Sequence, residues 1–170
     1  MSFRLGCLLL LLISFAGCAT QPPELTTQPG VSLSGRKLIV APTVNETGKA
    51  YDFDIAQVFT SDLQSALQAK GYELASMSQP PPDAVIVQCT FLSYAPGNAA
   101  KRWLLPGWGS TEATVKTSLV DHATGRIVGG MLTRKEVAGG GLLSVGADES
   151  ILQTIADDVA GAINDKVRGS

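Results

Sequence analysis

The chain has 170 residues, of which 45% are hydrophobic and 16% are charged, and this length suits one compact domain better than two. Thirteen Lys and Arg residues stand against fifteen Asp and Glu residues, so the net charge is −2, and the pI near 5.3 gives no general attraction to nucleic acid. Leu, Ile and Val recur in runs that can bury a core, which excludes intrinsic disorder over most of the chain.

An apolar run near the N-terminus predicts an export signal. It covers residues 5–15, after the single positive charge of Arg4, and small residues follow it. The run is too short to cross the hydrocarbon core of a bilayer as a helix, which takes about 20 apolar residues. We therefore expect residues 1–17 to be a cleaved signal peptide.

The sequence Phe15-Ala16-Gly17-Cys18 resembles the bacterial lipobox, although Leu is usual at its first position. The resemblance implies cleavage before Cys18, a diacylglyceryl thioether on its sulfur, and acylation of the new amine by a fatty acid such as palmitate. More than one acyl chain gives stable attachment, because each buried methylene contributes about 0.8 kcal/mol. By analogy with sorting in Gram-negative bacteria, Ala19 implies the outer membrane, with the domain in the periplasm.

A cleaved and lipidated chain keeps one further cysteine, Cys89, which then has no partner for an intramolecular disulfide. Cys89 lies in an alternating apolar run, so we expect it to be buried as a small hydrophobic residue.

Residues 18–35 are rich in Pro, Thr and Ser and lack apolar periodicity, so we predict a lipidated cysteine followed by a flexible linker. Residues 36–170 are then a single domain. A buried strand is expected over residues 37–42, and a possible short strand over residues 72–75. Between them, apolar spacing predicts an amphipathic helix that is opened by Asp54 and closed by Lys70-Gly71.

Residues 83–94 alternate with apolar side chains on both faces, which favours a central strand. Residues 112–120 and 126–137 are extended and flank the turn 121–125, which predicts an antiparallel hairpin. A second amphipathic helix is expected over residues 148–167. The order β-α-β-β-β-β-α predicts an α+β fold, with a mostly antiparallel sheet of four to five strands packed by two amphipathic helices.

The residues that usually carry catalysis are not grouped in this sequence. The single histidine, His122, lies in the expected hairpin turn, where a solvated residue is commoner than a ligand. Acidic pairs at 52/54 and 157/158 lie on predicted helices, where capping or an exposed face explains them. We predict a non-enzymatic protein with no catalytic residue, no metal and no cofactor.

Residues 97–109 differ from the rest, because they hold both tryptophans and two adjacent cations between two predicted strands. Tryptophan often anchors interfaces, and the cations can meet a lipid headgroup or a carboxylate. The candidate interaction residues are therefore Lys101, Arg102, Trp103 and Trp108. The alternative is that the tryptophans cover the sheet while the two cations stay solvated.

The stretch GNAAKRWLLPGWGSTEATVKTSLVDHATGRIVGG at residues 97–130, with Lys70-Gly71-Tyr72 before it, resembles bacterial lipoproteins of the domain-of-unknown-function family numbered 4410. Gly-Asn, basic-basic, Gly-aromatic-Gly and Asp-x-x-Thr-Gly elements occur there in one order. The resemblance covers residues 37–167. It implies the class of protein and supplies no catalytic residues.

Taken together, these patterns predict a lipid-anchored, non-enzymatic envelope lipoprotein that serves as a protein-interaction or assembly module facing the periplasm. Its partners would be the membrane, through Cys18, and an envelope protein, with no nucleic acid. Two alternatives stay open: a small-molecule or glycan-binding protein, or an uncommon hydrolase, with a site near the 97–109 loop. That loop can also rest on the lipid surface.

Overall fold

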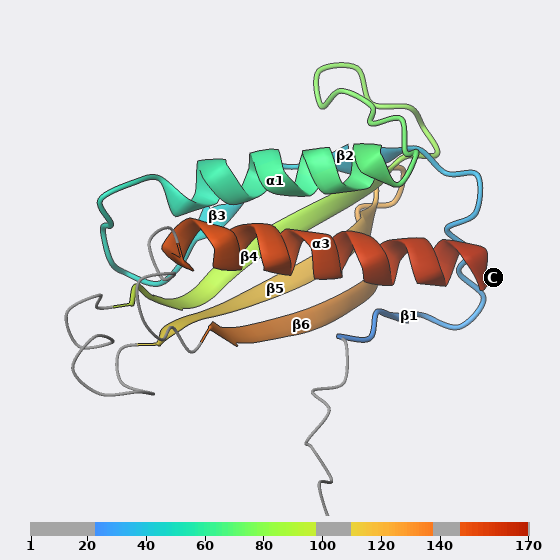
Figure 1. Cartoon of the computed structure of the whole chain (residues 1–170). Coiled ribbons are helices and arrows are strands. Elements are labelled where there is room, and N and C mark those ends of the chain that lie inside the picture. Colours follow the sequence, from blue (N-terminus) through green and yellow to red (C-terminus); the bar gives the residue numbers. More distant parts are fainter. Residues whose placement is uncertain (1–22, 98–109, 138–146, 170) are drawn as a thin grey trace, which may run out of the picture.

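The computed structural model describes residues 23–97, 110–137 and 147–169 (Figure 1). In chain order the elements are β1 (Thr26–Thr27), β2 (Leu38–Val40), β3 (Val44–Asn45), α1 (Ile55–Ala69), β4 (Val85–Ala95), β5 (Thr111–Asp121), β6 (Ile127–Val137) and α3 (Ala147–Arg168).

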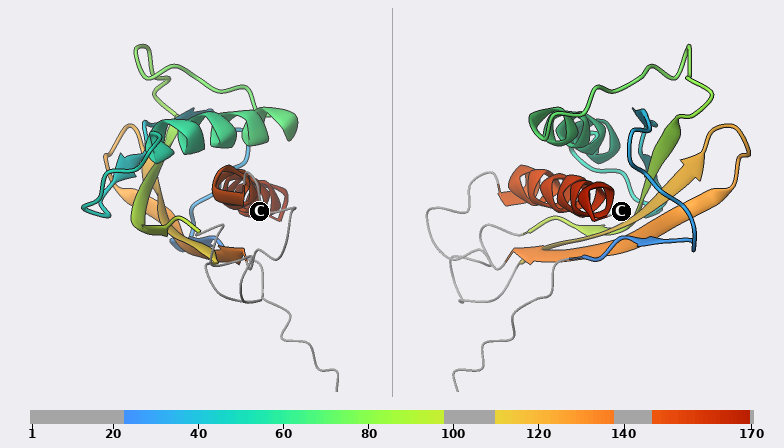
Figure 2. Two further views of the ribbon diagram at one scale, coloured as in Figure 1. Left: turned by 60° about the vertical axis from the view of Figure 1, so that its left-hand side comes forward. Right: turned by 90° about the vertical axis from the view of Figure 1, so that its right-hand side faces the viewer.

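The six strands form one mixed sheet in the order β1-β6-β5-β4-β2, with β3 also paired to β4. The pairs β1–β6, β6–β5 and β5–β4 are antiparallel, whereas β2 and β3 run parallel to β4. α1 and α3 lie side by side on one face of the sheet, and no described element covers the opposite face, which we call the outer face (Figure 2). The fold is the predicted α+β class, with six strands in place of four to five.

α1 confirms the helix predicted from capping signals and apolar spacing. The carboxylate of Asp54 accepts hydrogen bonds from the backbone N–H groups of Ala56 and Gln57, both at 3.0 Å, so it satisfies two donors at the helix start. The helix ends before Gly71, whose φ of +89° is a conformation that favours glycine. Its buried face consists of Ile55, Phe59, Leu63, Ala66 and Leu67.

α3 confirms the predicted C-terminal helix and completes the core. It packs against α1, β5 and β6. Its spacing of apolar positions follows the helical repeat, so one stripe of side chains faces the sheet. That stripe is fully buried and consists of Ile151, Leu152, Ile155, Ala156, Val159, Ala160 and Ile163.

β4 lies inside the sheet, as its two partly apolar faces predicted. It pairs with β5 on one side and with β2 and β3 on the other. Val85, Val87, Cys89 and Phe91 point to the helix side and are buried, whereas Gln88 between them is exposed. β5 and β6 form the predicted antiparallel hairpin.

The strand expected at residues 72–75 is not formed. Leu74 makes only an isolated bridge to Leu38, and the N–H of Ala75 donates to the carbonyl of Leu38 at 2.8 Å. A turn and three prolines follow at residues 76–82, and proline cannot donate to a strand ladder. The extended segment at residues 72–75 therefore ends before it can form further hydrogen bonds with β2.

The linker expected over residues 18–35 is shorter than predicted. Leu25 and Leu33 are only 3% and 2% exposed and belong to the core. Between them, β1 pairs with β6 through Thr26 opposite Gly130 and Thr27 opposite Gly129. Two leucines eight positions apart make no helical or alternating pattern, so periodicity cannot reveal them. The folded domain includes Leu25 and does not begin at residue 36.

Candidate functional site

Cys18 and four candidate interaction residues lie outside the described residues: Lys101, Arg102, Trp103 and Trp108. The structure does describe the two ends of the 97–109 segment, Gly97 after β4 and Ser110 before β5. Ala95 is paired with Glu112 in the β4–β5 ladder, so both ends of the segment leave the sheet together. The sheet thus fixes where this segment begins and ends.

An aromatic cluster supports the same end of the sheet, and sequence reasoning missed it. The rings of Tyr51 and Tyr94 pack edge to face with centroids 4.9 Å apart, and Phe53 and Phe91 also pack against Tyr94. The hydroxyl of Tyr51 donates to the carbonyl of Tyr94 at 3.0 Å and lies 2.8 Å from the hydroxyl of Thr47. The segment before α1 is thereby fastened to the end of β4.

A small hollow of about 160 Å³ lies beside this cluster. Ligand sites in proteins usually measure about 300–1,000 Å³, so this hollow by itself has room for a small group or a few water molecules only. It is lined by Thr47, Lys49, Leu92, Ser93, Tyr94, Ala95 and Glu112.

A larger open groove, of about 720 Å³, lies where the N-terminal segment meets α3. Four carboxylates and one ammonium group line it: Glu24, Asp157, Asp158, Asp165 and Lys166, with Pro23, Leu25, Gly161 and Ala162 between them. The ammonium of Lys135 lies 2.7 Å from the carboxylate of Asp158. Burial, and then the charges of Asp157 and Glu149, raise the pKa of Asp62 on α1. The groove therefore carries more carboxylates than cations.

The outer face of the sheet has a different chemistry. One row across it, set by the strand registers, runs from Val44 through Thr90 and Lys116 to Leu132. Val44 and Leu132 are 51% and 60% exposed, and Leu92, at a bulge in β4, is 43% exposed. The outer face thus combines large exposed apolar side chains with polar and cationic neighbours.

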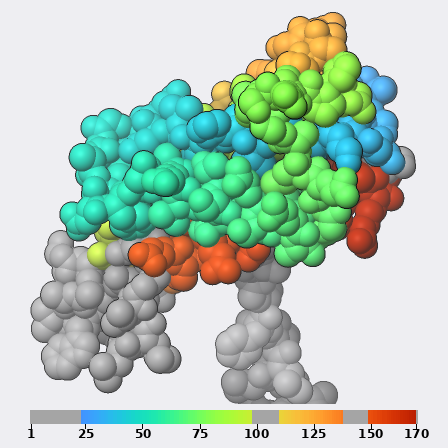
Figure 3. Space-filling model, turned by 90° about the horizontal axis from the view of Figure 1, so that it is seen from above, coloured from blue at the N-terminus to red at the C-terminus, as the bar shows by residue number. Residues whose placement is uncertain are grey.

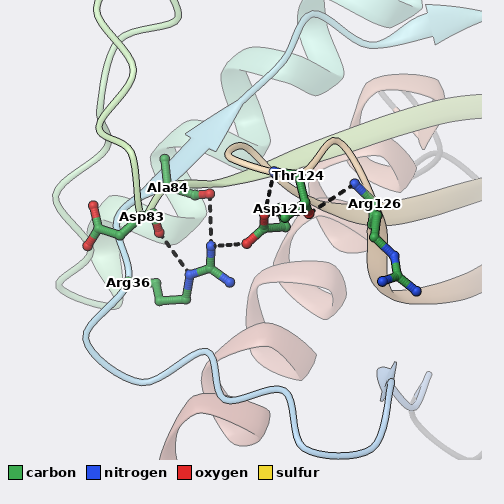
Figure 4. Close-up of polar contacts among 6 residues, drawn as sticks. All are labelled: Arg36, Asp83, Ala84, Asp121, Thr124 and Arg126. Atoms are coloured by element: carbon green, nitrogen blue, oxygen red, sulfur yellow. Dashed lines mark hydrogen bonds and ion pairs between the residues drawn. The ribbon is translucent and has the colours of Figure 1, made fainter.

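A polar cluster closes the other end of the sheet (Figure 4). Nε of Arg36 donates to the carbonyl of Asp83 at 2.8 Å, and its Nη2 donates to the carbonyl of Ala84 at 3.2 Å. The same Nη2 lies 2.5 Å from Oδ2 of Asp121. Oδ1 of Asp121 accepts from the backbone N–H and the hydroxyl of Thr124, at 2.8 and 2.6 Å.

These contacts lower the pKa of Asp121 from 3.8 to about 2: the Thr124 hydroxyl has the largest effect, followed by Arg36. Gly125 next to them has a φ of +66°, which the turn requires and glycine allows. The Asp-x-x-Thr-Gly element therefore has a structural role: it forms the hairpin turn and connects that turn to the chain before β2.

Cys89 is buried among the core side chains, as predicted, with its sulfur 3.5 Å from the hydroxyl of Thr117. Burial raises the pKa of its thiol to about 11, so the thiol stays protonated at neutral pH. His122 lies in the hairpin turn, also as predicted, and its backbone N–H donates to the carbonyl of Ala84 at 3.0 Å.

Residues 23–97, 110–137 and 147–169 contain neither a metal-binding cluster nor a membrane-spanning helix. No three His, Cys, Asp or Glu side chains in these ranges are grouped so that they could hold a metal ion. No helix in the same ranges has both the length and the apolar character needed to cross a membrane.

Comparison with protein families gives one match. The model of the family described as Domain of unknown function (DUF4410) matches residues 14–141, which is more than half of the chain. The chain belongs to the DUF4410 family. No curated protein matches it.

Several solved structures share the fold of this DUF4410 protein. A single-residue variant of the PelC dodecamer from Paraburkholderia phytofirmans is 15% identical, with 82% of this chain and 97% of that chain covered and a TM-score of 0.60. The PelC dodecamer itself is 17% identical over 80% and 96% of the two chains, with a TM-score of 0.54. A protein from Xanthomonas campestris is 10% identical over 85% and 92%, with a TM-score of 0.55. At such identities the likeness establishes the fold alone.

Proposed function

We propose that this DUF4410 protein is a lipid-anchored, non-enzymatic protein of the bacterial envelope that acts by binding other proteins, including further copies of itself. Its anchor is Cys18, its location is the outer membrane, and its domain faces the periplasm. The lipobox-like sequence ending at Cys18 supports the anchor.

The roles of the reactive groups favour binding over catalysis. Asp54 caps α1, Asp121 joins the hairpin turn to Arg36, and the thiol of Cys89 is buried and protonated. Each of these groups is thereby used in the architecture of the domain. A nucleophile or an acid–base pair needs an accessible group with a suitable pKa, which the buried thiol of Cys89 and the ion-paired carboxylate of Asp121 do not offer.

The observation that carries the assembly proposal is the uncovered outer face. The bulge of β4 places Leu92 there, and Val44 of β3 lies on the same face at the neighbouring strand. Leu92 also borders the hollow at the base of the 97–109 segment, which contains Lys101, Arg102, Trp103 and Trp108. Apolar side chains that are rimmed by polar ones are typical of interfaces, so we propose that this area and the segment form one contact surface.

The occupant that we propose for the β3–β4 part of this surface is a second copy of the chain. The fold-level likeness to PelC, which is described as a dodecamer, supports self-association of this fold. Proteins anchored in one leaflet also meet each other at a high effective concentration, so a modest apolar surface is enough to join them.

Mass spectrometry of the mature protein tests the anchor. We expect Cys18 as the first residue, carrying fatty chains, and an unlipidated precursor for Cys18→Ser. A bare thiol on a mature protein that osmotic lysis releases would refute the anchor.

Light scattering of the lipidated protein in detergent tests the assembly. Leu92→Asp should lower the molar mass of the particle to that of the monomer, because it buries a charge in the interface. Met77→Asp is the matched control, because Met77 is 50% exposed but lies in the segment after α1. A monomeric parent protein, or an equal effect of the two variants, contradicts the proposal.

Crosslinking in intact cells tests the 97–109 segment. Trp103→Ala and Trp108→Ala should reduce capture of a partner while leaving the melting temperature within a few degrees of the parent. A collapse of thermal stability would instead make the tryptophans core residues. Stabilisation by a small molecule or glycan, with no partner captured, would favour the alternative function.

A further inference from the structure

We propose that the β6 edge of the sheet lies against the bilayer, with the outer-face side chains of β6 among lipid headgroups. The proposal rests on lipidation of Cys18, which is part of the proposed function. It adds the orientation of the domain and names a second surface, on β6, whose partner is anionic lipid.

The chain between the anchor and the fold is short. Leu25 is packed in the core, so only residues 19–24 separate it from Cys18. Fully extended, the seven steps from Cys18 to Leu25 reach about 23–25 Å. Two of the six residues between them are prolines, which favour an extended, stiff backbone.

The domain is wider than the reach of this tether. A compact domain of this length has a radius of gyration of about 15 Å, so it measures roughly 35–40 Å across. The tether is attached at the β1–β6 edge, because β1 pairs there immediately after Leu25 (Figure 1). The opposite edge is formed by β2, β3, α1 and the segment that follows α1 (Figure 3). A tether shorter than the domain cannot turn this opposite edge toward the membrane.

The charge differs on either side of the attachment point. On the α3 side, four carboxylates and the ammonium of Lys166 line the groove. On the β6 side, Arg126 and Arg134 are exposed; Arg134 makes an exposed ion pair with Glu112 at 3.2 Å, and Glu136 is exposed on the same strand. Anionic headgroups repel the acidic groove more than this nearly balanced face, so the domain turns its β6 side toward the lipid.

Exposed apolar surface lies on the same strand. Leu132 and Ile127 are 60% and 54% exposed on β6, close to the arginines. Apolar side chains flanked by arginines fit the boundary between headgroups and acyl chains, where the guanidinium meets phosphate and the apolar group leaves water. More than half of the surface of each of these two side chains is in contact with water in the domain alone.

Spin labels on the lipidated protein test the orientation. Nitroxides are placed through Leu132→Cys on β6 and Ser78→Cys near the opposite edge, each in a Cys89→Ala background, in vesicles of phosphatidylethanolamine and phosphatidylglycerol. A nickel chelate attached to lipid headgroups should relax the label at 132 several-fold more than the label at 78. Equal relaxation at the two sites overturns the proposal.

A charge reversal tests the chemistry of the contact. Arg134→Glu should reduce relaxation of the label at 132 by the headgroup chelate, while the protein still sediments with the vesicles. Lys70→Glu, at an exposed residue at the end of α1, is the matched control and should leave relaxation unchanged. If Arg134→Glu folds normally by circular dichroism and relaxation does not change, the proposal is wrong.

Sedimentation with the vesicles distinguishes failure of the anchor from failure of the orientation. A protein that does not carry lipid on Cys18 stays in the supernatant of the vesicles, which refutes the proposed anchor and the orientation with it. A lipidated protein that sediments, but whose label at 132 senses only water-soluble relaxation agents, refutes the orientation alone.

Discussion

Arg36 and Asp121 are 85 positions apart in the sequence, yet Nη2 of Arg36 lies 2.5 Å from Oδ2 of Asp121. The arginine also donates to the carbonyls of Asp83 and Ala84, so one side chain joins the chain before β2, the start of β4 and the hairpin turn. The side chains of Arg36 and Asp121 are 19% and 15% exposed, which protects the pair partly from water.

Asp121→Asn is expected to weaken the pH dependence of stability at low pH. The folded state lowers the pKa of Asp121 from 3.8 to about 2, so its contribution to stability is present above pH 3.8 and is lost as the pH falls toward 2. The free energy of unfolding, measured by urea titration at several pH values, should therefore fall more in the parent protein than in the variant.

Asp83→Asn is the matched control for that experiment. Asp83 binds Arg36 through its backbone carbonyl, and the substitution keeps that group. It should leave the pH profile unchanged. Parallel pH profiles for Asp121→Asn and the parent protein would contradict the role given to Asp121.

Leu25→Ala is expected to lower the free energy of unfolding by about 2–5 kcal/mol, because it removes a buried side chain and leaves a cavity. The same substitution at Leu132, which is 60% exposed, should change the free energy by less than about 0.5 kcal/mol in the absence of lipid. Urea unfolding of both variants checks this. If the two variants lost equal amounts of unfolding free energy, the N-terminal segment would be a linker and not part of the core.

Gly129→Ala is expected to loosen β1. A Cβ atom at residue 129 would lie 3.0 Å from the carbonyl oxygen of Thr26 and 3.2 Å from the side chain of Thr27. The variant should therefore be cut faster by a protease after β1, near Gly30 or Gly35. Cleavage as slow as in the parent protein would show that the sheet accommodates the methyl group.

Gly161→Ala, in contrast, is expected to stabilise the folded protein. A Cβ atom at this position of α3 meets nothing within 4 Å, and alanine favours a helix over glycine by about 0.5–1 kcal/mol. The melting temperature should rise by a few degrees. A decrease would indicate that the groove beside α3 has less room than the structure shows.

Cys89 is expected to react with a thiol reagent only after the protein unfolds. Its thiol is buried and has a pKa near 11, so at pH 8 about one thiol in a thousand is ionised. The labelling rate in increasing urea should follow the unfolding transition. Ser34→Cys, at an exposed position, should be labelled at once in the native protein, and equally rapid labelling of Cys89 would contradict its burial.

The elements that sequence analysis predicted well carry their signals locally. Asp54 and Gly71 mark the ends of α1, and the alternation along β4 marks both its extended conformation and its interior position. Asp121 at the end of β5 and Gly125 in the connection to β6 are turn residues that suit a hairpin. In each case the physical cause lies within a few residues of its effect.

The features that sequence analysis missed depend on residues far apart. β1 and β3 have two residues each, and their pairing depends on β6 and β4. Tyr51 and Tyr94 meet only because the chain before α1 returns to the end of β4. No local pattern encodes such contacts, since tertiary packing decides them. The candidate residues Lys101, Arg102, Trp103 and Trp108 lie outside the described residues, so their role stays a prediction.

The position of α3 after β5 and β6 in the chain affects how the protein folds. Its buried stripe covers both strands, so they keep an exposed apolar face until residues 147–168 have been synthesised. A polypeptide that stops before residue 147 leaves that face uncovered, and exposed apolar surface makes such a chain prone to aggregation. Closure of the core therefore waits for the synthesis of α3.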